Sequence, residues 1–313
     1  MRYVIGIDAG GTKTAGLLAD ESGKILREAR GAGANLRAHG ELGVEKSLFQ
    51  VIDALDAPGP VDALCLGIAG VARSEEQALV RDLLRRLGIR RAVRIVNDAL
   101  VALVAGAPDG HGIVLVAGTG SIAYGVDPSG KVARSGGWGY LLGDEGSAFW
   151  LGHAAVRLGI RSADGRGPAT SLYSKICAQL EMFQPTELVE WFYDQELSRT
   201  RVAQLARVVE EAASEGDEAA QDLLDQAARH LARAARAVER QLDFPGEYPL
   251  VLSGGAFRAC PSLVRRIEVR LDDLPKARIA QLEVSPAHGA VTLALELLRE
   301  GEPAVVSGSE APK

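Results

Sequence analysis

Glycine turns that directly follow buried strands constrain this chain more than any other feature of its sequence. The first is IGIDAGGTKT at residues 5–14, and VAGTGS at residues 116–121 repeats its outline. Glycine lets backbone N–H groups approach an anion closely, and neighbouring hydroxyls can donate to phosphate oxygens. A third cluster, LSGGAF at residues 252–257, ends a strand and opens a helix, where N–H groups suit an anion or a nucleotide. Three such turns together indicate a phosphate or nucleotide site.

Asp8 stands at the end of the strand that precedes the first turn. A carboxylate beside a phosphate-binding loop is a natural ligand, direct or through water, for the Mg²⁺ that accompanies a nucleotide. The loop is not a Walker A motif, because Thr12 rather than Lys follows Gly11 and a strand is expected next. The alternative is an ordinary hairpin with Asp8 as a turn former.

Apolar runs around these turns predict a repeated α/β architecture. Three short strands at the N-terminus are followed by alternating helices and strands, and a second group of three strands begins at Gly112. Aligning Gly11 with Gly118 also pairs Thr14 with Ser121, which indicates an internal repeat. We expect two related lobes, each a mixed sheet flanked by helices.

The expected domain limits follow from this pattern. The N-terminal lobe takes residues 1–110, and a helix at residues 286–299 packs back onto it. The C-terminal lobe takes residues 111–285, with a helical insertion at about residues 144–245. Residues 300–313 are small, polar and contain proline, so we expect a flexible tail there. Short strands are expected at residues 250–252 and 281–284.

Composition excludes several classes of partner. The chain carries 35 basic and 41 acidic residues, a net charge of −6, so neither nucleic acid nor an anionic membrane is an expected partner. Its three cysteines lie far apart without a CxxC pair, which favours a reducing, cytoplasmic setting. No signal peptide or membrane span is indicated. The arginine-rich segments at residues 81–91 and 229–240 contain acidic residues too, and predict solvated helix faces rather than anion sites.

The order of the motifs resembles a known family. DAGGTKT, the Asn97–Asp98 pair, AGTGS, the block GGWGYLLGDEGSAFW at residues 136–150 and SGGAF are arranged as in the sugar-kinase branch of the actin-like, ribonuclease H-like ATPases. The likeness is greatest to N-acetylglucosamine kinases and the BadF/BadG/BcrA/BcrD-type ATPases, over residues 2–298. It implies two ribonuclease H-like lobes, each with a mixed five-stranded sheet and flanking helices, and an active site in the cleft between them.

The resemblance also implies which residues hold the nucleotide. In the family the first two glycine turns hold phosphates and the third lies against the adenosine. The residues that match these positions, and are expected to bind ATP with Mg²⁺ at Asp8, are Gly10, Gly11, Thr12, Lys13, Thr14, Thr119, Gly254 and Gly255.

A kinase also needs a carboxylate that orients the acceptor hydroxyl and takes its proton. Asp98 matches the family's catalytic aspartate, although an Asp between a strand and a helix is otherwise typical of an N-cap. Without the resemblance, Trp138 would be interpreted as a core residue and Asp144 as another N-cap. The resemblance instead implies a sugar site, whose residues are Asn35, Asp98, Gly120, Ser121, Gly137, Trp138 and Asp144.

These features predict an ATP-dependent kinase that phosphorylates an amino sugar, with N-acetylglucosamine to its 6-phosphate as the leading case. Glucosamine and N-acetylmuramic acid stay open as substrates. An ATPase that activates a partner enzyme through a cysteine-bound iron–sulfur cluster is a second class, against which the scattered cysteines count. A sugar-sensing regulator is a third, against which the absence of an added DNA-binding segment counts. The resemblance also implies a homodimer.

Overall fold

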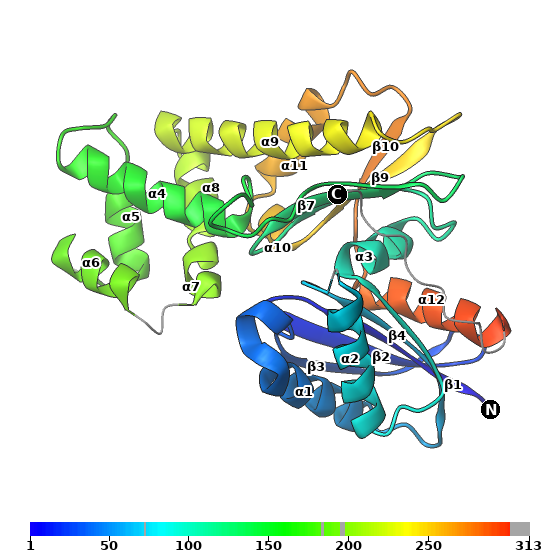
Figure 1. Cartoon of the computed structure of the whole chain (residues 1–313). Helices are drawn as coiled ribbons and strands as arrows, with labels where there is room; N and C mark the ends of the chain where they lie inside the picture. Colours follow the sequence, from blue (N-terminus) through cyan, green and yellow to red (C-terminus); the bar gives the residue numbers. More distant parts are fainter. Residues whose placement is uncertain (72, 183–184, 195–197, 301–313) are drawn as a thin grey trace. The chain divides into compact units, whose positions relative to one another are not determined.

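The computed structural model describes residues 1–71, 73–182, 185–194 and 198–300. The chain divides into two compact units (Figure 1). Unit 1 contains Met1–His111 and the segment that starts at Leu282, and unit 2 contains Gly112–Gln281. The tail expected at residues 300–313 lies, beyond Glu300, outside the described residues. Among the described helices, none is long and apolar enough to cross a membrane.

Unit 1 is built on a five-stranded mixed sheet with the order β3-β2-β1-β4-β5. The first three strands pair antiparallel, and β1, β4 and β5 are parallel. Its strands are β1 (Tyr3–Ala9), β2 (Lys13–Asp20), β3 (Ile25–Ala32), β4 (Val61–Ile68) and β5 (Ala92–Asn97). Its helices are α1 (Leu36–Leu55), α2 (Ser74–Arg86), α3 (Asp98–Gly106) and α12 (Ala287–Glu300). The first of these helices is broken at Gly40, whose backbone is not helical.

Helices cover both faces of the first sheet because its strands alternate their apolar residues. Ile5 and Ile7 belong to the hydrophobic core that contains the buried residues of α1 and α2. Val4 belongs to a second core, on the other face, that contains the buried residues of α3 and α12. The C-terminal helix lies directly on the central strand: a Cβ added at Gly6 would stand 2.3 Å from the backbone nitrogen of Val291. The strand at the centre of unit 1 is therefore buried from both sides.

Unit 2 repeats the same strand pattern. Its sheet has the order β10-β9-β6-β7-β8, with β6, β7 and β8 antiparallel and β6, β9 and β10 parallel. Its strands are β6 (Gly112–Ala117), β7 (Ser121–Val126), β8 (Val132–Gly136), β9 (Tyr248–Ser253) and β10 (Ala277–Gln281). Two mixed five-stranded sheets of the same topology confirm the predicted fold class.

The last strand of unit 2 lies earlier than predicted. We expected residues 281–284, but β10 ends at Gln281, which pairs with Leu252 of β9. Because β9 ends one residue later and the chain then turns at Gly254, no partner backbone continues beside Glu283.

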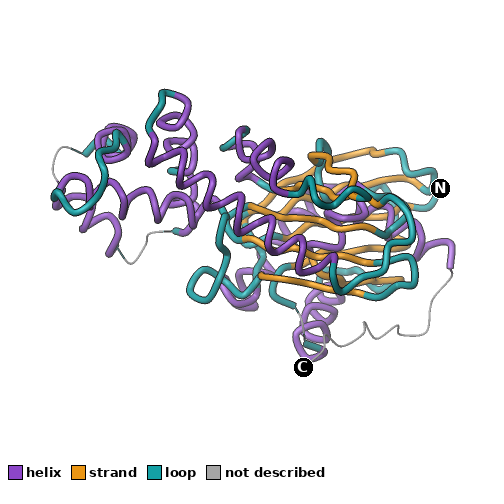
Figure 2. Tube along the Cα trace, turned by 90° about the horizontal axis from the view of Figure 1, so that it is seen from above, coloured by secondary structure: helices purple, strands orange, loops and turns teal. Residues whose placement is uncertain are grey.

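Helices fill the stretch between β8 and β9. In Figures 1 and 2, α4 to α7 gather beyond one end of the sheet of unit 2, while α9 runs along that sheet. The helices of unit 2 are α4 (Ala148–Ala163), α5 (Leu172–Gln179), α6 (Pro185–Tyr193), α7 (Arg199–Gln204), α8 (Ala206–Ser214), α9 (Glu218–Glu239), α10 (Gly255–Ala259) and α11 (Ser262–Arg270).

The turn after β2 is repeated after β7, in the register that the two glycine turns suggested. Oδ1 of Asp20 accepts from the backbone N–H of Ser22 at 2.9 Å and of Lys24 at 3.2 Å. Oδ1 of Asp127 accepts from the N–H of Ser129 at 2.9 Å and of residue 131 at 3.0 Å. Such Asx turns satisfy backbone donors where the strand ends, so the repeat extends well beyond the glycines.

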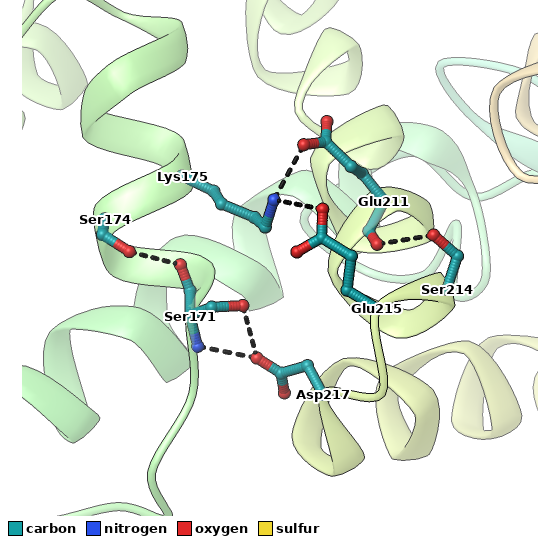
Figure 3. A network of polar contacts seen from close by, with 7 residues as sticks. All are labelled: Ser171, Ser174, Lys175, Glu211, Ser214, Glu215 and Asp217. Atoms are coloured by element: carbon teal, nitrogen blue, oxygen red, sulfur yellow. Dashed lines mark hydrogen bonds and ion pairs between the residues drawn. The ribbon is translucent and has the colours of Figure 1, made fainter.

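A polar network joins the helices of the insertion (Figure 3). The ammonium of Lys175 on α5 donates to Glu211 at 2.7 Å and to Glu215 at 2.9 Å. Asp217 caps α9 by accepting from the N–H of Ala220 at 3.0 Å, and its other oxygen accepts from the N–H of Ser171 at 2.6 Å. One carboxylate therefore fixes the start of α5 to the start of α9.

Replacing Asp217 with Ala should destabilise the protein by about 1–3 kcal/mol, because it removes an N-cap and leaves several donors without an acceptor. Urea unfolding followed by circular dichroism measures the change. Asp222→Ala, an exposed position on the same helix, is the control and should stay within about 0.5 kcal/mol of the native protein. Equal effects of both substitutions would contradict this role for Asp217.

Candidate active site

Two aspartates lie at one edge of the sheet in unit 1. Because β1, β4 and β5 are parallel, their carboxyl ends share an edge, where α/β sheets usually bind ligands. Asp8 pairs with Gly67 of β4, and Gly67 pairs with Val96 of β5, so Asp98 follows two residues beyond that register. The backbones of the two acidic residues are therefore separated by two strand spacings, about 10 Å.

Asp98 is not the N-cap of its helix. That position is held by Asn97, whose side-chain oxygen accepts from the N–H of Ala99 at 2.8 Å. Asp98 is the first residue of α3, and its Oδ1 lies 3.1 Å from the same N–H. The helix therefore has a cap without Asp98, so the capping interpretation does not account for this carboxyl.

Burial perturbs both carboxyls. It raises the pKa of Asp8 to about 7, with a further increase from the charge of Asp98 and a partial opposing effect of Lys13. Burial also raises the pKa of Asp98 to about 6, against the opposing backbone N–H groups of Ala99 and Asp98 itself. Asp98 is thus close enough for its charge to disfavour ionisation of Asp8.

This pair fits a hydrated Mg²⁺ better than a metal held by protein alone. The described residues contain no group of three or more His, Cys, Asp or Glu side chains placed to hold a metal ion. Mg²⁺ commonly takes one or two carboxylates, together with waters and substrate phosphates. A divalent cation would also relieve the repulsion that raises the pKa of Asp8.

The first glycine turn is held from behind by the chain after β3. The N–H of Ala34 donates to the carbonyl of Gly10 at 3.0 Å, and Nε2 of His39 donates to the carbonyl of Gly11 at 3.0 Å. A Cβ at Gly33 would stand 2.4 Å from that same Gly11 oxygen. No sequence motif indicated His39, because its partner is a backbone atom.

The polar residues of this turn point in different directions. Thr12 and Lys13 are exposed, whereas Thr14 is fully buried and its hydroxyl donates to the carbonyl of Ala32 at 2.7 Å. Alternation along β2 turns Thr14 toward α1. Of the predicted phosphate ligands, Thr14 thus uses its hydroxyl within the fold.

Asn35 lies beside the residues that follow β4. Gly70 has a φ of +80°, and a Cβ there would stand 3.2 Å from Nδ2 of Asn35. Because β4 ends at Ile68, next to Asn97 of β5, Asn35 belongs to the same edge as the two aspartates. Unit 1 therefore places Asn35 at the sheet edge that also carries Asp98, the other predicted sugar residue of this unit.

In unit 2, the second glycine turn is fastened to the loop that precedes α4. The N–H of Ser121 donates to Oδ1 of Asp144 at 3.2 Å, and its hydroxyl donates to the carbonyl of Glu145 at 2.9 Å. A Cβ at Gly120 would stand 2.8 Å from the Asp144 carboxylate. Thr119 lies within the same turn. Glycine at position 120 is thus required by the close approach of Asp144.

Asp144 is buried and has a φ of +62°, a backbone conformation that Asp tolerates better than most residues. Burial raises its pKa, although the N–H of Ser121 opposes this. The capping interpretation of Asp144 is wrong, because Ser147 caps α4 by accepting from the N–H of Trp150 at 3.1 Å.

Trp138 lies on the surface. Its side chain is 63% exposed, so the core interpretation is wrong, and the Arg134 guanidinium lies 4.5 Å from its ring centroid. Gly137, with a φ of +72°, lies against Ile122, where a Cβ would stand 2.8 Å from the side chain. The backbone before Trp138 therefore needs glycine.

A cavity of about 290 Å³ adjoins Trp138. Its polar lining comes from β7, β8, the following loop and α9. It includes Ser121, Ser135, Glu145, His230 and Arg233. Sequence reasoning missed His230 and Arg233, because they come from a helix almost a hundred residues further along and carry no motif.

The third glycine turn lies against the second. Gly254 has a φ of +121°, and a Cβ there would stand 2.2 Å from the carbonyl oxygen of Ala117. Gly255 begins the short helix α10 and is half-buried. Unit 2 thus brings Gly254 and Gly255 beside the turn that contains Thr119.

Comparisons with known proteins show to which family the chain is related. The model of the BadF/BadG/BcrA/BcrD ATPase family matches residues 5–294. The chain is 34% identical to the N-acetylmuramic acid/N-acetylglucosamine kinase of Clostridium acetobutylicum, over 94% of this chain and 98% of that protein. It is 33% identical to the N-acetyl-D-glucosamine kinase of Dictyostelium discoideum, over 93% and 97%. A solved structure from Chromobacterium violaceum, provisionally named N-acetylglucosamine kinase, matches with a TM-score of 0.72 and 28% identity over 95% and 99%.

The repeated sheets and these matches define an ATP-dependent kinase of the ribonuclease H-like fold. Because the family model covers most of its length, the chain belongs to the BadF/BadG/BcrA/BcrD ATPase family. The family predicted from the motif order is thereby confirmed, as is the enzyme class.

Asp8→Asn should change how stability depends on pH. With a pKa of about 7 in the folded protein and about 3.9 in the unfolded chain, Asp8 binds more protons when folded between these values. Its burial therefore lowers the free energy of unfolding as pH rises from about 4 to 7. The stability of Asp8→Asn relative to the native protein should increase over that range and then level off.

Urea unfolding in EDTA, without ligands, measures this difference. Asp20→Asn is the control, because the pKa of Asp20 is shifted in the opposite direction to that of Asp8. Hydrogen bonds from Ser22 hold the pKa of Asp20 below its usual value. Its stabilising contribution is present above that usual value, so its difference from the native protein should be constant from pH 5 to 8. A constant difference for Asp8→Asn as well would refute the raised pKa of Asp8.

Proposed function

We propose that this chain transfers the γ-phosphoryl group of MgATP to a hydroxyl of an amino sugar, with N-acetylglucosamine to its 6-phosphate as the leading reaction. The observation that carries the proposal is Asp98. It is a half-buried carboxyl whose pKa lies near 6, at the sheet edge that also carries Asp8. The names of the two curated relatives support the amino sugar as acceptor.

Asp98 acts as the general base. In its ionised form it accepts the proton of the acceptor hydroxyl while the new O–P bond forms and the bond to the β-phosphate oxygen breaks, releasing ADP. A pKa near 6 leaves most of the carboxyl ionised at neutral pH and still basic enough to take a proton. Mg²⁺ held by Asp8 would neutralise phosphate charge.

The glycine turns supply the nucleotide contacts in this proposal. Gly10, Gly11, Thr12 and Lys13 bind phosphate, since the last two are exposed and the turn is held from behind by His39. Thr14 contributes through its backbone and through its bond to Ala32 rather than through a free hydroxyl. The remaining nucleotide residues are Thr119, Gly254 and Gly255.

The predicted sugar residues include side chains that can stack on a sugar ring or bind its hydroxyls. Trp138 offers an exposed ring of the kind that stacks on sugar C–H surfaces, and Asp144 and Asn35 bind sugar hydroxyls, while Gly137 gives the backbone at the ring its conformation. Ser121 acts by holding the Asp144 loop, to which both of its hydrogen bonds go, and Gly120 leaves space for the Asp144 carboxylate.

Asp98→Asn should lower kcat by about 10²–10⁴-fold, because the amide cannot accept the proton. Binding of ATP, measured by calorimetry, should persist. In the native enzyme, kcat/KM should fall as the pH drops below about 6, where Asp98 becomes protonated. Asp109→Asn, in the exposed loop after α3, is the control and should retain activity.

Full activity of Asp98→Asn would show that Asp98 is not the general base. Loss of ATP binding together with activity would instead place this carboxyl in the nucleotide site.

An ADP-release assay with several acceptors tests the substrate. We expect the highest kcat/KM with N-acetylglucosamine, followed by N-acetylmuramic acid, and lower values with glucosamine and glucose. The binding energy of the acetamide is the physical reason, since a site that hydrogen-bonds a group rejects analogues that lack it. ATP hydrolysis at the same rate with every sugar and with none would favour an ATPase that activates a partner enzyme.

The three cysteines fit poorly with that second class. Cys65, Cys177 and Cys260 are all buried, and burial raises the pKa of the Cys65 and Cys260 thiols to about 12. Cluster ligands are thiolates. Buried free thiols also support our proposal of a reducing, cytoplasmic setting. We keep a homodimer as part of the proposal, to be measured by light scattering.

A further inference from the structure

Helices α9 and α11 of unit 2 present arginines to a common groove. On α9, Arg229, Arg233 and Arg236 follow the spacing of one helix face. The face of α11 on the other side of the groove carries Arg265, Arg266 and Arg270. The groove has a volume of about 700 Å³. The sequence predicted a solvated face for residues 229–240, but it could not show that a second helix adds three more arginines.

Acidic residues neutralise only part of this charge. Asp225 pairs with Arg266 and lies 3.5 Å from Arg270, and Asp273 pairs with Arg236 at 2.6 Å. The other three arginines form no hydrogen bond or ion pair with any residue that the structure describes. They are Arg229, Arg233 and Arg265. Six guanidiniums thus face two carboxylates in a chain whose net charge is −6.

Two donors in the groove are buried without an acceptor. Nε of Arg266 and Nε of Arg270 are shielded from solvent and have no hydrogen-bond partner among the described residues. An unsatisfied buried donor is unfavourable, more so on a charged group. Arginine does not lose its proton in proteins, so the groove keeps its positive charge, which an anion bound there would offset.

We propose that this groove is a binding site for a phosphate group, either free or as the monoester of a small metabolite. Guanidinium forks match the oxygens of phosphate and can bind them in pairs. The groove is concave and of the size that encloses a small molecule, which favours a metabolite over an extended acidic partner. None of the residues proposed for catalysis lines this groove, and the inference does not rest on the proposed function.

Calorimetry of the full chain with inorganic phosphate and with N-acetylglucosamine 6-phosphate tests the site. The double variant Arg229→Gln/Arg265→Gln changes two exposed arginines that form no ion pair with any described residue, and it leaves Arg233, which also lines the smaller cavity, in place. We expect its Kd for phosphate to rise at least about tenfold, because each lost guanidinium removes charge-assisted hydrogen bonds. Arg207→Gln, an exposed arginine on α8, should leave the Kd unchanged.

The two ligands distinguish the source of the anion. Equal affinity for both indicates free phosphate, and tighter binding of the monoester that depends on Arg229 and Arg265 indicates a phosphorylated metabolite. An unchanged Kd in the double variant, with an unchanged urea midpoint, overturns the proposal. It is also overturned if neither ligand binds the native protein at millimolar concentration, or if only a polyanion such as poly-glutamate binds.

Discussion

The parallel pairing of β1, β4 and β5 is the constraint on which the rest of the candidate site depends. It sets the carboxyl ends of three strands at one edge, and so brings Asp8 and Asp98 together although ninety residues separate them. That arrangement requires close packing behind the sheet. α12 lies directly on Gly6, and a Cβ at Gly289 would stand 2.0 Å from the carbonyl oxygen of Val101 in α3. Burial, and to a lesser extent the charge of Asp98, raises the pKa of Asp8 at this edge. An ionised Asp8 at this edge therefore destabilises the folded protein, unless a cation binds there or the carboxyl is protonated.

Much of the fold follows from local pattern, because its signals are local. Buried strands followed by glycine turns predicted both meanders, and the repeat is deeper than the glycines indicated. The turns at Asp20 and Asp127 use the same side-chain oxygen to accept from backbone donors two and four residues later. The edge strand β10 was misplaced by about four residues, since its limit is set by the end of β9 rather than by its own composition. Pairing partners decide where short strands end, and a single segment does not contain that information.

The site was less predictable than the fold, for a related reason. The sequence singled out Asp98, Asp144 and Trp138 as candidate site residues. The capping and core interpretations of these residues could be rejected only from the structure, in which Asn97 and Ser147 are the caps and the Trp138 ring is exposed. His230 entered the smaller cavity only through packing of α9 beside β7 and β8. The same applies to the arginine groove, whose charge is divided between two helices that are distant in sequence. A sequence motif identifies residues that act within one turn. The residues that line a cavity are brought together by tertiary packing and carry no such motif.

The two glycine turns show how a duplicated element divides its tasks. Ala9 pairs with Thr14 across the first turn, but Ala117 pairs with Ser121 across the second, which is one residue shorter. Thr14 turns its hydroxyl inward to the carbonyl of Ala32, so the exposed polar groups of the first turn are Thr12 and Lys13. Ser121 instead fastens the second turn to Asp144. The longer turn therefore leaves side chains outside for a ligand, while the shorter turn uses its own to build the loop that carries Trp138. Equivalent hydroxyls in a repeat consequently need not share a role, and a functional assignment by alignment has to be checked against the partner that each one contacts.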